Sequence, residues 1–179
     1  HVGVIHNPTS NMKISSGISP VARMLKAGVA VGLGTDGTAS NNDLDMWEEM
    51  RLAAFLQKVA TMDPQVVPAR TALRMATLGG AQAIGLEREI GALTAGRRAD
   101  VIQVSLDDVH FLPLYDVISH LVYVAHERDV VTVIVDGRIL LSEGRIRSID
   151  QKRTRSEATA IAARIRTEVI DKAEKGAAP

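Results

Sequence analysis

The sequence predicts an α/β protein in which a parallel strand–helix–strand unit precedes a group of short strands. Residues 2–5 and 29–33 are apolar runs of strand length, and the stretch between them closes with a helical pattern. A strand, a loop, a helix and a second strand in this order form the parallel crossover unit. Apolar runs at 101–104, 130–135 and 139–141 lie among glycines and predict further strands.

The composition is that of a soluble globular protein. The 179 residues are 46% apolar and 23% charged, which suffices for one domain or somewhat more. Lys plus Arg and Asp plus Glu number 21 each, so no net field attracts nucleic acid or an anionic membrane. Cysteine is absent, no apolar run approaches the ~20 residues of a membrane span, and the opening residues do not resemble a signal peptide. We expect a cytoplasmic protein with neither nucleic acid nor membrane as partner.

The crossover unit begins with a strand that closes on a polar segment. Residues 9–17 are polar and rich in turn formers, so we expect a loop there. Ser19 is expected to cap the following helix, with Pro20 at its first position. Gly28 is expected to end that helix, and the second strand follows directly.

A long helix is expected after the crossover unit, over about residues 44–60. Asn41-Asn42-Asp43 is the expected cap cluster. The buried stripe of this helix is expected to consist of Leu52, Phe55, Leu56 and Val59.

Shorter elements are expected in the remainder of the chain. Residues 69–78 predict a helix, and a further short helix ends at Gly85. Residues 115–125 are helix-like, and Asp136-Gly137 between two apolar runs is a strong hairpin signal. Residues 155–175 predict a final amphipathic helix.

A change of pattern near residues 86–90 divides the chain. Glycines and short strands replace the long helices after this point. The expected organisation is therefore residues 1–88, residues 89–150 and a C-terminal helical segment, residues 151–179.

Asp36 is the leading candidate for chemistry. It stands in Gly34-Thr35-Asp36-Gly37, directly after the second apolar run. The carboxyl end of a buried parallel strand is where barrel enzymes keep their catalytic groups. The alternative is that Asp36 is a turn former, because an aspartate side chain between glycines readily caps its own backbone.

Several motifs resemble one enzyme family. His6-Asn7-Pro8-Thr9-Ser10-Asn11, Gly34-Thr35-Asp36-Gly37 and residues 40–46 resemble the last two barrel strands of the amidohydrolase superfamily. The branch is that of the methylthioadenosine/S-adenosylhomocysteine deaminases and the triazine hydrolases. The segments that follow the barrel in this branch are similar to four further stretches of the sequence, residues 76–81, 90–93, 96–100 and 133–138. The resemblance implies the C-terminal part of a metal-dependent (β/α)₈ barrel with part of a small β-sandwich and a C-terminal helix.

The resemblance implies a metal-dependent hydrolase of non-peptide C–N bonds. Asp36 matches the aspartate at the end of strand eight, which binds a divalent metal, usually Zn²⁺. Such a metal lowers the pKa of its water, and an adjacent carboxylate can pass that proton to the departing ammonia. The implied small-molecule substrate is an aminopurine nucleoside of the methylthioadenosine, S-adenosylhomocysteine or adenosine type.

Two further residues are candidates for contact with the substrate. Ser40 would lie on the loop that rims the mouth of the barrel, although a helix-cap or turn role suits it equally. His6 stands at the end of the first strand and faces the same rim. A lone histidine is more often a structural hydrogen-bonding group than a ligand.

Most of the family's metal ligands are missing from the sequence. The five histidines stand at positions 1, 6, 110, 120 and 126, so no His-x-His pair exists. One carboxylate cannot hold a zinc ion, which takes three or four protein ligands. Two strands also cannot close a barrel. We therefore expect the chain alone to be inactive, with its apolar strand edges exposed.

Two alternatives stay open at this point. One is a chlorohydrolase, or an amidohydrolase of triazines or cyclic amides, from the same superfamily. The other is a non-catalytic association module. Residues 40–46 favour the deaminase, and family members are often homo-oligomers, so a homo-oligomer is an expectation from the resemblance.

Overall fold

The computed structural model describes residues 2–170, which form two separate sheets with helices packed between and beside them. The predicted α/β class is confirmed by the parallel pair β1-β2 and its surrounding helices. Within the described part of the chain, no helix has the length and apolar character that crossing a membrane requires.

The elements of the first half surround the parallel pair. They are β1 (Gly3–His6), α1 (Pro8–Lys13), α2 (Val21–Lys26), β2 (Ala30–Leu33), α3 (Met46–Thr61), α4 (Ala69–Arg74), the π-helical turn η1 (Met75–Gly79) and α5 (Gly80–Ala83).

The elements of the second half form an antiparallel sheet and the C-terminal helix. They are β3 (Val101–Val104), the 3₁₀ turn η2 (Val109–Phe111), α6 (Val117–Tyr123), the 3₁₀ turn η3 (Glu127–Asp129), β4 (Val130–Val135), β5 (Arg138–Ser142), β6 (Arg145–Ile146), α7 (Gln151–Ile165) and the π-helical turn η4 (Arg166–Ile170).

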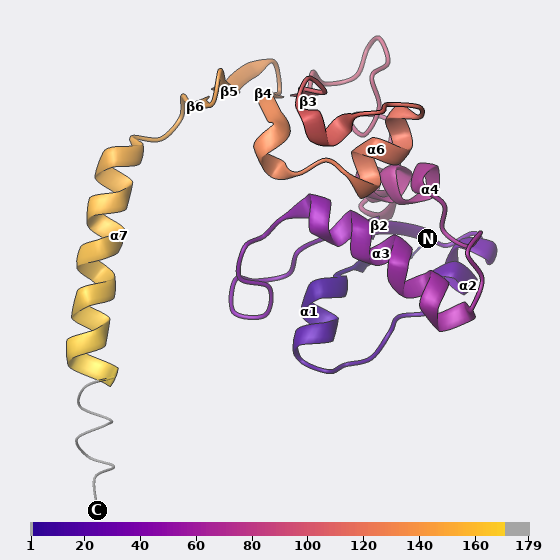
Figure 1. Ribbon diagram of the computed structural model, residues 1–179, viewed down its shortest axis with the longest axis horizontal. Helices are drawn as coiled ribbons and strands as arrows, with labels where there is room; N and C mark the ends of the chain where they lie inside the picture. The colour runs from indigo at the N-terminus through magenta and orange to yellow at the C-terminus, as the bar shows by residue number, and fades with distance from the viewer. Residues whose placement is uncertain (1, 171–179) are drawn as a thin grey trace, which may run out of the picture.

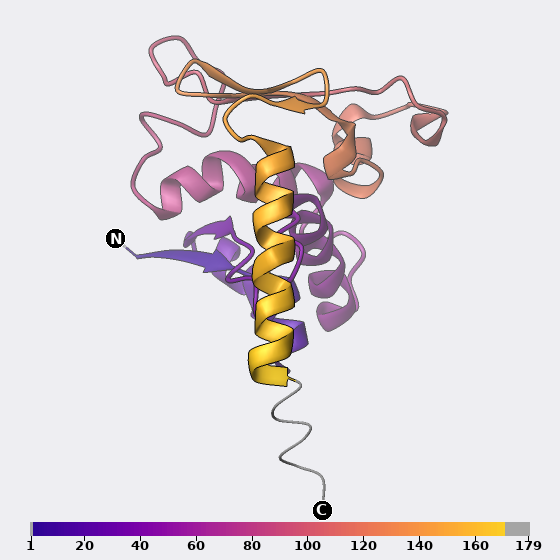
Figure 2. The same ribbon diagram turned by 90° about the vertical axis from the view of Figure 1, so that its left-hand side faces the viewer.

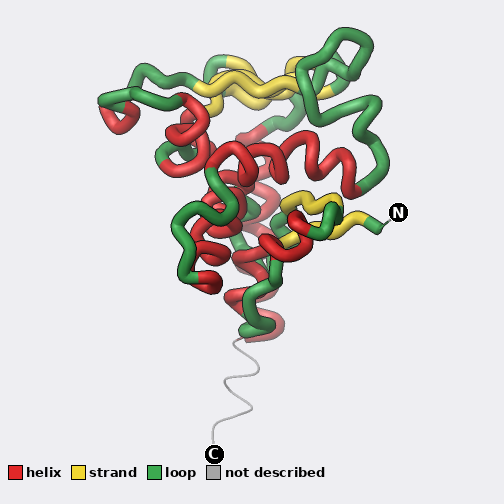
Figure 3. Tube along the Cα trace, turned by 90° about the vertical axis from the view of Figure 1, so that its right-hand side faces the viewer, coloured by secondary structure: helices red, strands yellow, loops and turns green. Residues whose placement is uncertain are grey.

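The two sheets lie in different layers of the molecule. The sheet β3-β4-β5-β6 runs across one end, above the helical stretch formed by α4, η1 and α5 (Figures 2 and 3). The pair β1-β2 lies on the other side of those helices. Helix α7 leaves the antiparallel sheet and extends away from the body (Figure 1), and the side chains of residues 151–169, in α7 and η4, are all exposed.

One face of the parallel pair carries the main core. The strands pair in register with His6 opposite Leu33, so Val31 and Leu33 share a face with His6. Val31 and Leu33 belong to the hydrophobic core together with Val21 of α2 and Met50 of α3. Helices α2 and α3 therefore cover this face, and they fix the direction in which β2 delivers its carboxyl end.

The opposite face of the pair is shaped by glycines. Gly32 of β2 faces Gly80 of α5, and a Cβ at position 32 would lie 2.6 Å from the Gly80 Cα atom. A Cβ at Gly3 would lie 1.9 Å from the carbonyl oxygen of Ala83. Only glycine allows α5 to approach the strands this closely. Each strand pairs with one neighbour, which leaves its outer edge unpaired among the described residues, in agreement with the expected open edges.

The predicted loop at 9–17 is wrong over its first half, where α1 forms. Pro8 begins this helix, but Asn7 at the N-cap position makes no side-chain hydrogen bond to it. The backbone N–H of Thr9 is instead accepted by the carboxylate of Glu49 in α3, at 3.1 Å. A distant side chain thus stabilises a helix that the local sequence does not specify.

The predicted cap at Ser19 is also wrong. Helix α2 begins after Pro20 and has no side-chain cap of its own. Gln57 of α3 takes that role, because its Oε1 accepts the Ala22 N–H at 3.0 Å and its Nε2 donates to the Ser19 carbonyl at 2.8 Å.

Helix α3 exists as predicted, but its cap and its buried face differ. The cap is Asp45, which accepts the Trp47 N–H at 2.7 Å, rather than the predicted cluster at 41–43. Phe55 and Val59 are 44% and 68% exposed, so the predicted stripe is wrong. The fully buried positions are Glu49, Met50, Ala53, Ala54 and Gln57. The polar members of this face are buried because they hydrogen-bond other segments.

Helix α3 also holds α6 in place. The indole Nε1 of Trp47 donates to the Leu121 carbonyl at 2.9 Å, and Arg51 Nη2 donates to the Ala125 carbonyl at 2.7 Å. The Leu121 carbonyl lies in the last turn of α6, where a helix leaves its acceptors without intrahelical partners, and Ala125 lies two residues past the end of α6. The ring of Phe55 stacks on Tyr123, with centroids 5.3 Å apart.

The predicted strands of the second half are confirmed. Strands β3 and β4 have the predicted bounds, and β4 turns into β5 through Asp136 and Gly137. Both turn residues have positive φ, 50° and 75°, as this kind of hairpin requires. The final helix begins at residue 151, earlier than predicted, and the predicted positions 171–175 lie outside the described residues.

Candidate active site

Asp36 lies just past the carboxyl end of β2, on an exposed turn. Its backbone is left-handed, with φ of 61°, which an aspartate tolerates better than most residues. The turn points the carboxylate back across the end of the strand pair toward α1. The position is the one predicted for it.

Three hydrogen bonds hold the Asp36 carboxylate. Ser10 of α1 donates to Oδ2 at 2.7 Å, and Ser40 donates to the same oxygen at 3.0 Å. The backbone N–H of Gly37 donates to Oδ1 at 2.8 Å. The turn-former role and a functional role are therefore compatible, because Gly37 and Ser40 are local to the turn while Ser10 comes from α1, 26 residues away in the sequence.

These contacts keep Asp36 ionised. The hydrogen bonds from Ser10, Gly37 and Ser40 hold the pKa of the Asp36 carboxyl below its ordinary value, against a small opposing effect of burial. A carboxylate that is both exposed and fixed in direction is suited to bind a cation.

Of the two predicted substrate contacts, the structure brings Ser40 to Asp36 and places His6 elsewhere. The hydroxyl of Ser40 also lies 3.2 Å from the Gly37 carbonyl, so it belongs to the turn as well. His6 is 2% exposed, on the face of the strand pair that the helices cover. Neither of its ring nitrogens has a hydrogen-bond partner among the described residues.

The buried ring of His6 makes stability depend on pH. Burial lowers the pKa of His6 from its ordinary 6.5, so below that pH the unfolded chain binds a proton that the folded chain resists. The free energy of unfolding of the wild-type chain should therefore fall between pH 7 and pH 5.5, and His6 contributes at most about 1.4 kcal/mol per pH unit to that fall. We expect His6→Leu to remove this contribution, so that its free energy of unfolding falls less over the same interval. Urea titrations of both proteins at the two pH values measure this, and equal pH slopes would contradict it.

Three residues of the site were not predicted from the sequence. Ser10 stands within the quoted His6-to-Asn11 motif, but its role depends on α1, which was not expected. Glu49 and Asn41 are buried at 0% and 5% exposure. No local pattern marks a functional glutamate within an amphipathic helix, since its partners lie elsewhere in the chain.

Glu49 joins the two segments that hold Asp36. Its Oε2 accepts the Thr9 N–H of α1 at 3.1 Å, and its Oε1 accepts Nδ2 of Asn41 at 2.5 Å. Asn41 Oδ1 in turn accepts the Leu44 N–H at 2.7 Å. Burial raises the pKa of Glu49, and the hydrogen bonds from Thr9 and Asn41 oppose that effect. Lys13 adds a tie from α1 to the Ala39 carbonyl, at 2.9 Å.

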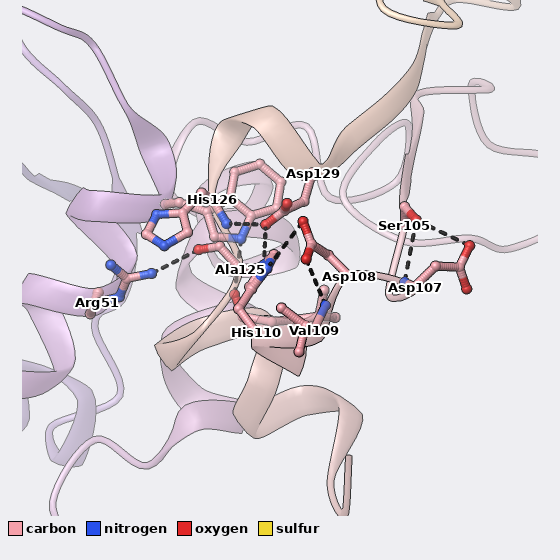
Figure 4. A network of polar contacts seen from close by, with 11 residues as sticks. Arg51, Ser105, Asp107, Asp108, Val109, His110, Ala125, His126 and Asp129 are labelled. Atoms are coloured by element: carbon pink, nitrogen blue, oxygen red, sulfur yellow. Dashed lines mark hydrogen bonds and ion pairs between the residues drawn. The ribbon is translucent and has the colours of Figure 1, made fainter. Parts of the chain in front are cut away.

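A second polar cluster lies before β4 (Figure 4). His110 Nε2 is 3.2 Å from Asp129 Oδ2, which also accepts the backbone N–H of His126 at 2.8 Å. Burial raises the pKa of Asp129, but these hydrogen bonds outweigh it and the net direction is downward. The cluster fastens the chain between α6 and β4. In residues 2–170, no three His, Asp or Glu side chains come together in a way that could hold a metal ion.

The chain belongs to the amidohydrolase family, whose model matches residues 1–140. It is 54% identical, over 92% of its length, to a 5-methylthioadenosine/S-adenosylhomocysteine deaminase from Desulforudis audaxviator. A protein of the same description from Syntrophomonas wolfei is 51% identical over 88% of the chain. The chain spans 38% and 36% of the lengths of these two relatives.

Solved structures show the same relationship. The chain matches a zinc-bound adenosine deaminase from Xanthomonas campestris with a TM-score of 0.90 and 40% identity, over 93% of the chain and 38% of that protein. An atrazine chlorohydrolase from Arthrobacter aurescens, in complex with zinc, matches with a TM-score of 0.81 and 32% identity, over 89% of the chain and 35% of that protein. The predicted fold, a portion of an amidohydrolase barrel enzyme, is confirmed.

Proposed function

We propose that the chain contributes strand-eight chemistry to a metal-dependent deaminase of aminopurine nucleosides. The observation that carries the proposal is the Asp36 carboxylate, exposed at the carboxyl end of β2 and fixed by three hydrogen bonds. The names of the relatives support the substrate class, and the zinc in the solved neighbours supports a divalent metal.

The Asp36 carboxylate can serve as one ligand of a metal ion. A carboxylate offers about four lone-pair directions. The hydroxyls of Ser10 and Ser40 occupy Oδ2, whereas Oδ1 accepts only the Gly37 N–H. Oδ1 therefore keeps a lone pair for a metal ion, which when bound would supply an activated water for attack on the amino-bearing carbon. Residues 2–170 bring no three His, Asp or Glu side chains together to complete such a site, so it would need ligands from outside these residues.

The structure bears differently on the two other candidate residues, Ser40 and His6. Ser40 is proposed to contact the substrate at the rim, since its hydroxyl lies beside Asp36. The predicted contact of His6 stays a prediction, and its burial on the helix-covered face gives it no open path to a ligand. The division into residues 1–88, 89–150 and 151–179, the cytoplasmic location and the homo-oligomer also stay proposals.

A chimeric protein tests the proposed reaction. In it, this chain replaces the matching segment of the Desulforudis audaxviator relative; we call it the chimera. We expect zinc-loaded chimera to release ammonia from methylthioadenosine, S-adenosylhomocysteine or adenosine, and to leave atrazine unchanged. Chloride release from atrazine without ammonia release from any nucleoside would favour the chlorohydrolase alternative, for which the Arthrobacter aurescens neighbour is the supporting observation.

A further inference from the structure

We propose that Glu49 is a positioning residue that sets the direction of the Asp36 carboxylate. The proposal rests on the proposed function, because it concerns the same site. It starts from a buried carboxylate, 0% exposed, that faces no cation among its described contacts. Burial of such a group is costly unless it is well hydrogen-bonded, so the groups that it bonds indicate its role.

Glu49 bonds the two segments that carry the hydroxyls on Asp36. One segment is α1, where Thr9, bonded to Glu49, is followed by Ser10, bonded to Asp36. The other is the site loop (residues 34–45), where Ser40, bonded to Asp36, is followed by Asn41, bonded to Glu49. Each oxygen of Glu49 therefore holds the residue next to a serine that holds Asp36.

The bonds of Glu49 have a fixed direction. Asn41 must present its Nδ2 to Glu49, because its Oδ1 is engaged by the Leu44 N–H. Thr9 presents a backbone N–H, which can only donate. Because Thr9 and Asn41 both donate, the side chain at position 49 must offer two acceptor oxygens. A carboxylate meets this condition and an amide does not.

The inference is tested by exchanging the carboxylate of Glu49 with the amide of Asn41. Glu49→Gln places an amide N–H₂ against a donor, so we expect α1 and the site loop to separate. Asn41→Asp alone places two carboxylates together. In the double variant Glu49→Gln/Asn41→Asp, the introduced glutamine accepts from Thr9 and donates to the introduced aspartate. That aspartate still accepts from Leu44, so every bond is restored at unchanged net charge.

The first readout uses the chain itself. NMR titration of the Asp36 carboxyl carbon reports its pKa, which we expect to rise toward its ordinary value in Glu49→Gln and to return in the double variant. Glu48→Gln is the control, because Glu48 lies in the same turn of α3 and bonds neither Thr9 nor Asn41. A wild-type Asp36 titration in folded Glu49→Gln would overturn the proposal.

The second readout uses the chimera. We expect Glu49→Gln to reduce zinc affinity or kcat by about tenfold, as for other residues behind metal ligands, and the double variant to recover most of that loss. If the wild-type chimera releases no ammonia, the proposed function fails, while the Asp36 titration still tests Glu49. If Glu49→Gln does not fold, a folded double variant with wild-type Asp36 titration supports the proposal. If the double variant does not fold either, Glu49 serves the core alone and the proposal is wrong.

Discussion

Replacement of Asp36 by Asn is expected to lower ammonia release by the chimera about 10³-fold and to lower its zinc content. The amide removes the negative charge that a metal ligand supplies, while its oxygen can still accept from Ser10 and Ser40. The fold should therefore survive, and the defect should lie in metal binding and chemistry. Metal analysis and steady-state kinetics with methylthioadenosine measure the two effects.

A matched variant separates this effect from a general loss of negative charge. Asp107 is exposed and lies in the segment between β3 and η2, remote in sequence from the site. We expect Asp107→Asn to keep wild-type zinc content and activity. An Asp36→Asn chimera with full zinc and full activity would remove Asp36 from the proposed site.

Gly32→Ala is expected to destabilise the chain by about 2 kcal/mol. The added Cβ would lie 2.6 Å from the Gly80 Cα and 3.0 Å from the Cδ1 atom of Ile5. The first contact is with backbone, so β2 or α5 must move. Because β2 delivers Asp36, the same shift should weaken zinc binding in the chimera. Urea unfolding of the chain measures the stability change.

Gly37 provides the control for this substitution. A Cβ at Gly37 would meet no atom within 4 Å, and its φ lies outside the left-handed region. Gly37→Ala also keeps the N–H that Asp36 accepts. We expect a change within about 0.5 kcal/mol. Equal destabilisation by Gly32→Ala and Gly37→Ala would mean that α5 does not pack closely on β2.

Much of the fold was predictable because apolar runs mark the strands directly. The bounds of β3 and β4 coincide with such runs, and the Asp136-Gly137 pair specifies its turn through local backbone preferences. The position of Asp36 was predictable for the same reason: a glycine-flanked carboxylate follows a buried strand.

The errors arise where distant side chains replace local ones. Helix α1 has a polar sequence, and Glu49, 40 residues further on, accepts one of its first N–H groups. Gln57 does the same for α2 across 35 residues. Glu49 and Gln57 lie on the buried face of α3, whereas the hydrophobic pattern predicts that Phe55 and Val59 are buried. The hydroxyl of Ser10 reaches Asp36 only once α1 has formed.

The most direct test of the account compares metal content and nucleoside deamination in the 179-residue chain and in the chimera. The chain supplies one carboxylate ligand, and zinc takes three or four from protein. We therefore expect stoichiometric zinc and ammonia release from methylthioadenosine in the chimera, and neither in the chain alone. A folded chimera without zinc or ammonia release would contradict the assignment of Asp36 to a deaminase metal site. Stoichiometric zinc in the chain alone would contradict the ligand count.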